Sequence, residues 1–219
     1  MRRTMTRAAM LFAALTVGCT PYAVSMSALP MARGEGQRTT TMVVDPGGAE
    51  WPADTSGKRR VRFAVPILDV EQRIGLDDRS DWGARIPTAS GVIVSYTRRL
   101  DVPTIRDSRA TAVMIGGGFV NFAQHVDGDV TLITTGRGSA SIVPYGGIHA
   151  NQIVPMSTTA VKDSPTIGLF GALTAGERNR GASAELGVLY DRSALWLRSN
   201  NFVVVPSIAL HGRMFERRP

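Results

Sequence analysis

Three histidines and one cysteine are the residues of this chain best suited to acid–base, nucleophilic or metal chemistry. His125, His149 and His211 lie far apart in the sequence, and no cysteine or carboxylate completes a metal-binding spacing such as H-x-x-x-H. We therefore expect no metal site and no cofactor. Each histidine is interpreted as structural, with His125 in a turn and His149 and His211 near the ends of strands.

Covalent catalysis by serine needs a histidine and an acid within reach of the nucleophile. Ser199 stands beside Asn200, but no histidine is near it in the sequence, and there is no G-x-S-x-G motif. Gly116-Gly117-Gly118 lacks the Lys-Ser/Thr that follows a phosphate-binding loop, so it is interpreted as strand glycine that permits close backbone approach. The sequence predicts a non-enzymatic protein, with a lipid hydrolase as the remote alternative.

Charged residues in the middle of β-like runs form the one constellation that the sequence singles out. Its members are Glu71, Arg73, Arg85, Arg99, Glu185 and Asp191. They alternate with apolar residues and have glycines close by in the same runs. A charge that is buried must be paired or hydrogen-bonded. The role of these residues therefore depends on which side of a sheet they occupy.

From Arg38 onward the chain is a series of short β-like runs separated by turn residues, and no long segment has helical periodicity. The runs cover residues 38–45, 59–65, 67–76, 80–87, 90–100, 110–122, 128–135, 140–154, 165–175, 182–191 and 201–211. Short turns alternate with longer polar loops, which is typical of an up-and-down meander. The pattern predicts an all-β fold, an antiparallel β-barrel of about ten strands, within a range of eight to twelve.

Alternation along several runs separates an apolar face from a charged one. In 182–191, Leu186 and Val188 fall on one face and Glu185 and Asp191 on the other; in 80–86, Trp82 and Ile86 oppose Arg85. A transmembrane barrel has an apolar exterior and a polar lumen, and this pattern favours it. The six-residue constellation would then be a charge network in the lumen. Trp82, Trp196, Tyr96, Tyr145 and Tyr190 could form interfacial girdles or pack in the core.

Composition limits the remaining classes. The 219 residues carry a net charge of +7, but three of the arginines lie within the first seven residues and no long block of like charge follows, so a nucleic-acid partner is not expected. Beyond residue 19 no apolar stretch approaches the length of a transmembrane helix. A body embedded in a membrane would have to be a closed barrel.

The N-terminal 19 residues have the order of a secretory signal peptide: arginines at 2, 3 and 7, an apolar run from Ala8 to Val17, and a small residue before a cysteine. Gly18 followed by Cys19, the only cysteine, resembles the lipobox of bacterial lipoproteins. The resemblance implies cleavage before Cys19 and its lipidation. An ordinary signal peptide cut nearby, for example after Ala23, is the alternative.

Segments such as EQRIGLDDRSDWGARI, GVIVSYTRRL and AELGVLYDRSALWLRS resemble hairpins of small bacterial outer-membrane β-barrel proteins, over about residues 60 to 211. Two features depart from that pattern. The chain continues past Leu210 to a charged end, and prolines at 66, 144 and 206 fall inside strand-like runs, which favours strand edges or bulges.

Together these observations predict a signal peptide over 1–18, a lipidated tether over 19–37, a barrel over 38–212 and a C-terminal tail over 213–219. The expected protein is a lipoprotein of the bacterial outer membrane with a structural or narrow-channel role. It would contact membrane lipid through Cys19 and the barrel exterior; an envelope protein partner is possible and not identified. The main alternative is a soluble, lipid-anchored periplasmic barrel that binds an apolar ligand, as lipocalins do.

Overall fold

The structure, a computed structural model, describes residues 23–50, 62–87, 90–101, 109–137, 141–156, 165–177, 180–190 and 202–215. Within them the strands are β1 (Gly36–Glu50), β2 (Arg62–Asp77), β3 (Ser80–Pro87), β4 (Val92–Arg99), β5 (Ala110–Val120), β6 (His125–Thr135), β7 (Ile142–Pro155), β8 (Thr166–Glu177), β9 (Arg180–Tyr190) and β10 (Phe202–Phe215). None of the described residues forms a helix long and apolar enough to cross a membrane.

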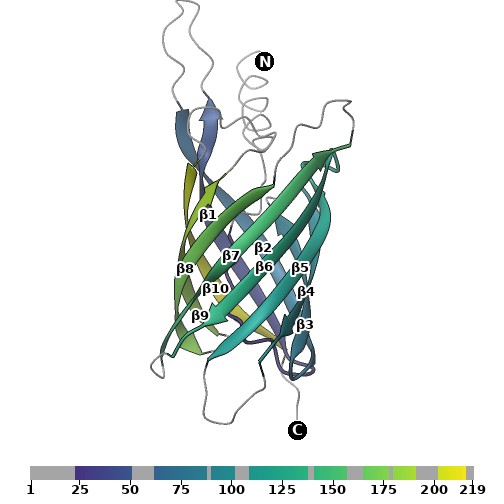
Figure 1. Ribbon diagram of the computed structural model, residues 1–219, viewed down its shortest axis with the longest axis vertical. Coiled ribbons are helices and arrows are strands. Elements are labelled where there is room, and N and C mark those ends of the chain that lie inside the picture. The colour runs from purple at the N-terminus through teal and green to yellow at the C-terminus, as the bar shows by residue number, and fades with distance from the viewer. Residues whose placement is uncertain are drawn as a thin grey trace, which may run out of the picture.

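These ten strands form a closed barrel in which each described strand pairs antiparallel with its neighbour in the chain (Figure 1). The seam is closed by β1 and β10, with Thr41 opposite Ala209. The predicted antiparallel barrel of ten strands is confirmed. Below, the hairpin end is the end where β1 begins and the two-residue turn after β2 lies; the loop end is the opposite one.

Eleven β-like runs become ten strands because the runs 59–65 and 67–76 belong to one strand, β2, which continues through Pro66. Each of the three prolines that fall inside the predicted runs keeps only one ladder neighbour. Pro66 pairs with Val44 of β1, whereas pairing with β3 starts at Asp69. Pro144 lies one residue beyond the β6–β7 ladder, and Pro206 one residue beyond the β1–β10 ladder. Because the strands of a barrel are tilted, neighbouring strands end at different heights along the rim. Each of these prolines therefore has a paired strand on one side only, as it would on an edge strand.

In the most regular strands, side chains alternate between the two faces of the wall. Along β4, Val92, Val94 and Tyr96 are exposed, whereas Ile93, Ser95 and Thr97 between them are buried. The outward positions of the strands carry large apolar side chains: Met42, Leu68, Trp82, Ile86, Ile115, Phe119, Val130, Leu132, Ile148, Leu169, Leu173, Leu186, Val188, Val204, Ile208 and Leu210. The apolar face of the wall is therefore the outer one.

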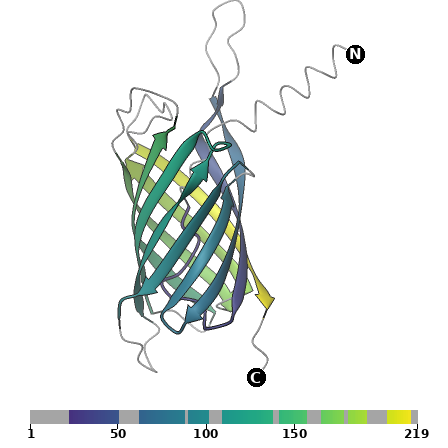
Figure 2. The same ribbon diagram turned by 90° about the vertical axis from the view of Figure 1, so that its right-hand side faces the viewer.

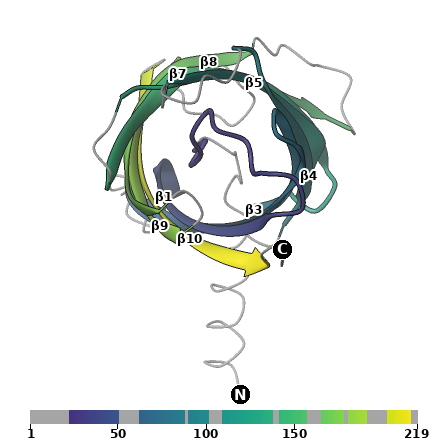
Figure 3. The same cartoon turned by 90° about the horizontal axis from the view of Figure 1, so that it is seen from below.

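Residues 23–35, the lumenal segment, cross the inside of the barrel before β1 begins (Figures 2 and 3). Ala23 packs against Val43, Ile67, Leu189 and Val203 towards the loop end. At the hairpin end, Arg33 forms a bridge with Gly75. The sequence predicts a tether over 19–37, but the described part of it is inside the barrel and β1 already begins at Gly36. Small and apolar residues, with no charge from 23 to 32, let it pack there.

Candidate functional site: the charged lumen and its lumenal segment

Two buried ion pairs join β2 and β3 inside the barrel. Arg73 pairs with Asp81, and Arg85 pairs with Asp69, both diagonally across the ladder. Arg73 also donates to Thr97 Oγ1 at 2.7 Å, so its guanidinium group spans three strands. The sequence alone does not single out Asp69 or Asp81. Each acid is displaced by two residues along the β2–β3 ladder from the position directly opposite its arginine.

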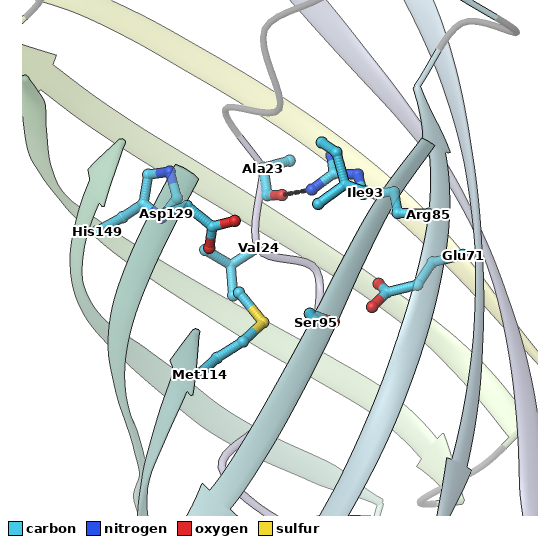
Figure 4. A pocket seen from close by; sticks show the side chains of 9 residues that line it. All are labelled: Ala23, Val24, Glu71, Arg85, Ile93, Ser95, Met114, Asp129 and His149. Atoms are coloured by element: carbon cyan, nitrogen blue, oxygen red, sulfur yellow. Dashed lines mark hydrogen bonds between the residues drawn. The ribbon is translucent and has the colours of Figure 1, made fainter. Parts of the chain in front are cut away.

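Glu71 lies opposite Arg85 in the ladder and between the two ion pairs. It is buried, and its carboxylate is directed into the lumen (Figure 4). Gly83 makes room for it, because a Cβ at position 83 would lie 2.9 Å from Glu71 Oε1 and 2.8 Å from Ser95 Oγ. An inward glycine next to a charged side chain therefore has a steric reason here.

Asp127 and Asp129 project inward from β6, two residues apart on the same face. Asn151 of β7 donates its amide to one oxygen of Asp127. The other oxygen of Asp127 and one oxygen of Asp129 are buried without a hydrogen-bond partner. Gly116 leaves space for Asp129, since a Cβ there would overlap its carboxylate. The glycine run at 116–118 thus permits close approach, as the sequence predicts.

Glu185 of β9 binds the lumenal segment rather than an arginine. Its Oε1 accepts from the backbone N–H of Val24 at 2.8 Å, and its Oε2 accepts from that of Ser25 at 2.9 Å. The hydroxyl of Tyr145 donates to the same carboxylate at 3.3 Å. Ser25 has a φ of 53°, in the left-handed region. The carboxylate therefore holds a backbone turn of the segment.

The lumenal segment is bound to the wall along its length. The Arg85 guanidinium donates to the Ala23 carbonyl at 2.7 Å, and the Ala28 N–H donates to Thr135 Oγ1 at 2.8 Å. The Met31 N–H donates to Asp81 Oδ2 at 2.9 Å. At the hairpin end Gly75 exchanges backbone hydrogen bonds with Gly34 and Glu35. Buried backbone groups need such partners, and with Glu185 of β9 they come from four strands of the wall: β2, β3, β6 and β9.

A cavity of about 20 Å³ remains beside the segment (Figure 4). Glu71, Arg85, Asp129 and His149 line it, together with Ala23, Val24, Ile93, Ser95 and Met114. This volume accommodates about one water molecule. With the segment in place, this cavity is therefore too small for a solute larger than water.

The structure places five members of the predicted constellation inside the barrel wall: Glu71, Arg73, Arg85, Arg99 and Glu185. They do not form one network. Arg99 lies at the hairpin end, where it donates to Asp101 Oδ2 at 2.8 Å. That hydrogen bond, with one from the Thr111 N–H, holds the pKa of Asp101 below its ordinary value. Asp191, Trp196 and Cys19 lie outside the described residues.

His211 lies at the end of the β9–β10 ladder, as expected, whereas His149 differs from its expected place. His149 is not at the rim but in the middle of β7, buried, with Nδ1 2.7 Å from Thr131 Oγ1. His211 lies between Thr39 Oγ1 and Ser183 Oγ, each 3.0 Å away. Sequence reasoning missed this serine–histidine contact, which arises because β1, β10 and β9 are neighbours. The third partner is a hydroxyl instead of a carboxylate, so the arrangement lacks the acid of a catalytic triad.

The aromatic residues divide between the two faces. Trp82 and Tyr96 face each other across β3 and β4 on the outer surface, where both are exposed. Tyr145 is buried and points inward, so it cannot belong to an interfacial girdle. Within the described residues, no group of three or more potential ligands is arranged to hold a metal ion.

No family model and no curated protein matches this chain. Among solved structures, the chain is similar to the outer membrane protein OprG from Pseudomonas aeruginosa. The sequence identity is 12%, and the alignment covers 85% of this chain and 97% of that one, with a TM-score of 0.35. A score this low carries no argument about function or location.

Proposed function

We propose that this protein is a non-enzymatic β-barrel of the bacterial outer membrane, closed at rest by its lumenal segment, with a structural or narrow-channel role. The observation that carries the proposal is the polarity of the wall. Large apolar side chains cover the outside, whereas carboxylates and guanidinium groups occupy the inside. Water requires the opposite arrangement, and lipid requires this one.

The same observation speaks against the lipocalin-like alternative. A soluble carrier of an apolar ligand needs an apolar cavity and a polar exterior. Here Leu169 is 61% exposed and Leu186 is 52% exposed, on strands whose inward neighbours include Glu185. The lumen is occupied by the protein's own residues 23–35. A lipid hydrolase finds no better support, because the Ser183–His211 contact is partly buried and lacks an acid.

Membrane integration is tested by fractionation of cells that produce the full chain. We expect the protein to remain in the outer-membrane fraction after carbonate and urea washes, and to migrate faster on gels before heating than after it. Release of the folded protein by either wash would contradict the membrane proposal and favour a soluble barrel held only by lipid.

A lipid anchor on Cys19 is the second part of the proposal. Labelled fatty acid should enter the wild type but not Cys19→Ala, whose precursor should stay unprocessed or be mislocalised. A wild type that never takes up label contradicts the anchor, while the barrel proposal stands.

The closed state is tested in planar bilayers. The full chain should show little conductance at low voltage, whereas a variant without residues 23–32 should conduct. Gly75→Val offers a full-length counterpart, because its side chain would overlap the Ala32 carbonyl oxygen and push the segment off the wall. If both variants stay as silent as the wild type, the narrow-channel role is wrong and a purely structural role remains.

A further inference from the structure

The interior of the barrel holds many more acids than bases. Among the described residues, six carboxyl side chains are buried inside the wall: Asp69, Glu71, Asp81, Asp127, Asp129 and Glu185. Apart from the Arg99–Asp101 pair at the hairpin end, two guanidinium groups, Arg73 and Arg85, face them. We propose that the pore opened by departure of the lumenal segment is selective for cations.

The lumenal segment does not supply the missing positive charge. Residues 23–32, AVSMSALPMA, contain no ionisable side chain. Their contribution is made by backbone N–H groups, which donate to Glu185 and Asp81. When the segment leaves, Glu185 loses its two backbone donors and keeps the Tyr145 hydroxyl, whereas Asp81 loses the Met31 N–H and keeps Arg73. The excess of acid over base in the lumen is then compensated by mobile cations.

The acids are not confined to one side of the wall. Glu71 lies on β2, Asp127 and Asp129 on β6, and Glu185 on β9. Glu71 and Asp129 approach the same cavity from opposite walls (Figure 4). Rings of Asp and Glu side chains are a common basis of cation selectivity, and a narrow passage with low-dielectric walls focuses their field.

Anions have no equivalent partner in the described lumen. Arg73 is bound to Asp81 and Arg85 to Asp69, so each guanidinium charge is already neutralised by a carboxylate. Asp127 and Asp129, by contrast, form no ion pair within the described residues, and each keeps one buried oxygen without a donor. The Asn151 amide donates to Asp127, and Arg85, which lines the same cavity as Asp129, is paired with Asp69. Those oxygens are the groups best placed to bind a passing cation.

This inference rests on the proposed channel role, and one experiment separates the two. The variant lacking residues 23–32 and full-length Gly75→Val are reconstituted in planar bilayers with a KCl gradient, and the reversal potential is measured. We expect a permeability for K⁺ well above that for Cl⁻. Asp127→Asn together with Asp129→Asn, introduced into both backgrounds, should move the ratio towards one. Asp78→Asn, in the exposed turn between β2 and β3, is the matched control and should leave it unchanged.

The outcomes are distinct. Conductance with a K⁺ preference that the Asp127/Asp129 pair controls supports the inference. Conductance with no preference, or with a preference for Cl⁻, overturns it and leaves the channel role intact, as does a K⁺ preference that Asp78→Asn weakens as much as the pair does. Silence of both backgrounds overturns the channel role and this inference with it. If the deletion variant does not form a barrel whose gel mobility changes on heating, the reversal potential of Gly75→Val alone tests the inference.

Discussion

Adjacent residues of one strand follow opposite rules in this barrel. On β6, Val126 and Val130 are exposed on the outside, whereas Asp127 and Asp129 are buried inside. On β9 the same holds for Leu186 and Glu185. The two faces are separated only by the thickness of the backbone. In the proposed membrane location the outer side chains meet lipid, which cannot solvate a charge, whereas a charge inside the barrel is paired or hydrogen-bonded.

The comparison also distinguishes two kinds of charge inside the barrel. Between β2 and β3, acids and arginines alternate and form ion pairs. On β6 and β9, the acids have neutral partners: an amide for Asp127 and backbone N–H groups for Glu185. The first kind belongs to the wall itself. The second depends on what fills the lumen, so the two should respond differently to substitution.

The largest effect is expected where a wall ion pair is broken. Arg73→Leu leaves Asp81, which is fully buried, without its cation. We expect a loss of about 3–5 kcal/mol in the free energy of unfolding, measured with urea in detergent. Adding Asp81→Leu should restore much of the loss. Arg98→Leu, an exposed arginine on β4, is the matched control and should cost at most about 1 kcal/mol. Equal losses of unfolding free energy for Arg73→Leu and Arg98→Leu would contradict the distinction between a buried, paired arginine and an exposed one.

The outer face is tested by a charge placed in its centre. Leu169→Arg, on β8, should cost about 2–4 kcal/mol in a lipid bilayer if that side chain faces hydrocarbon. Leu76→Arg lies next to the turn at the hairpin end, where the cost falls to about 0–1 kcal/mol. Both leucines are exposed, so a soluble barrel should tolerate both changes equally. Unfolding in lipid vesicles measures the difference, and its absence would argue against a membrane around β8.

A smaller effect is expected where a carboxylate binds the lumenal segment. Glu185→Gln keeps one acceptor for the two N–H groups of Val24 and Ser25, which should weaken the segment's attachment by about 1–3 kcal/mol. Protein with Cys19→Ser and Ser25→Cys, refolded in detergent so that export and lipid processing play no part, has a single thiol at a buried position. Maleimide should label it faster after Glu185→Gln. Tyr145→Phe removes a bond to the same carboxylate but none to the segment, and should change the labelling rate little.

The smallest effect concerns Asp101, beyond the end of β4. Its pKa is lowered by the hydrogen bond from Arg99, so its ionised form stabilises the folded state. This stabilisation is fully present above the ordinary aspartate pKa of about 4. It is lost as the pH falls through the lower pKa that Asp101 has in the folded state. The free energy of unfolding at pH 7 minus that at pH 3 should shrink in Asp101→Asn by about 1 kcal/mol or less. An unchanged difference would contradict the assignment.

Strand number and facing could be predicted from the sequence because period-2 alternation is a local property. Leu186 and Glu185 alternate whatever the partner strands are, and their side of the wall follows from the apolar set. Pro66 gives one β-like run too many, because proline cannot donate a hydrogen bond and therefore suggests a boundary between two strands where the structure has one, β2. Only the barrel's stagger shows that Pro66 needs one neighbour.

The partners of the charges could not be predicted, because they depend on register between strands. Arg73 finds Asp81 and Arg85 finds Asp69 along the diagonal of the β2–β3 ladder. The Ser183–His211 contact needs the β9–β10 pairing. The path of residues 23–35 cannot be predicted from local sequence. A short segment without charge from 23 to 32 is compatible both with a linker and with a segment that packs inside a barrel.

The position of the lumenal segment in the chain constrains how the barrel can assemble. Residues 23–35 precede β1, and the seam between β1 and β10 joins the two ends of the strand sequence. Because the segment lies inside the wall and directly precedes β1, we expect the strands to close around it as β1 and β10 pair, before the barrel is complete. Its backbone N–H groups donate to side chains of β9, β6 and β3, so we expect it to hold these strands in position while the barrel closes. A chain that loses these bonds should therefore assemble slowly even where the finished barrel is stable.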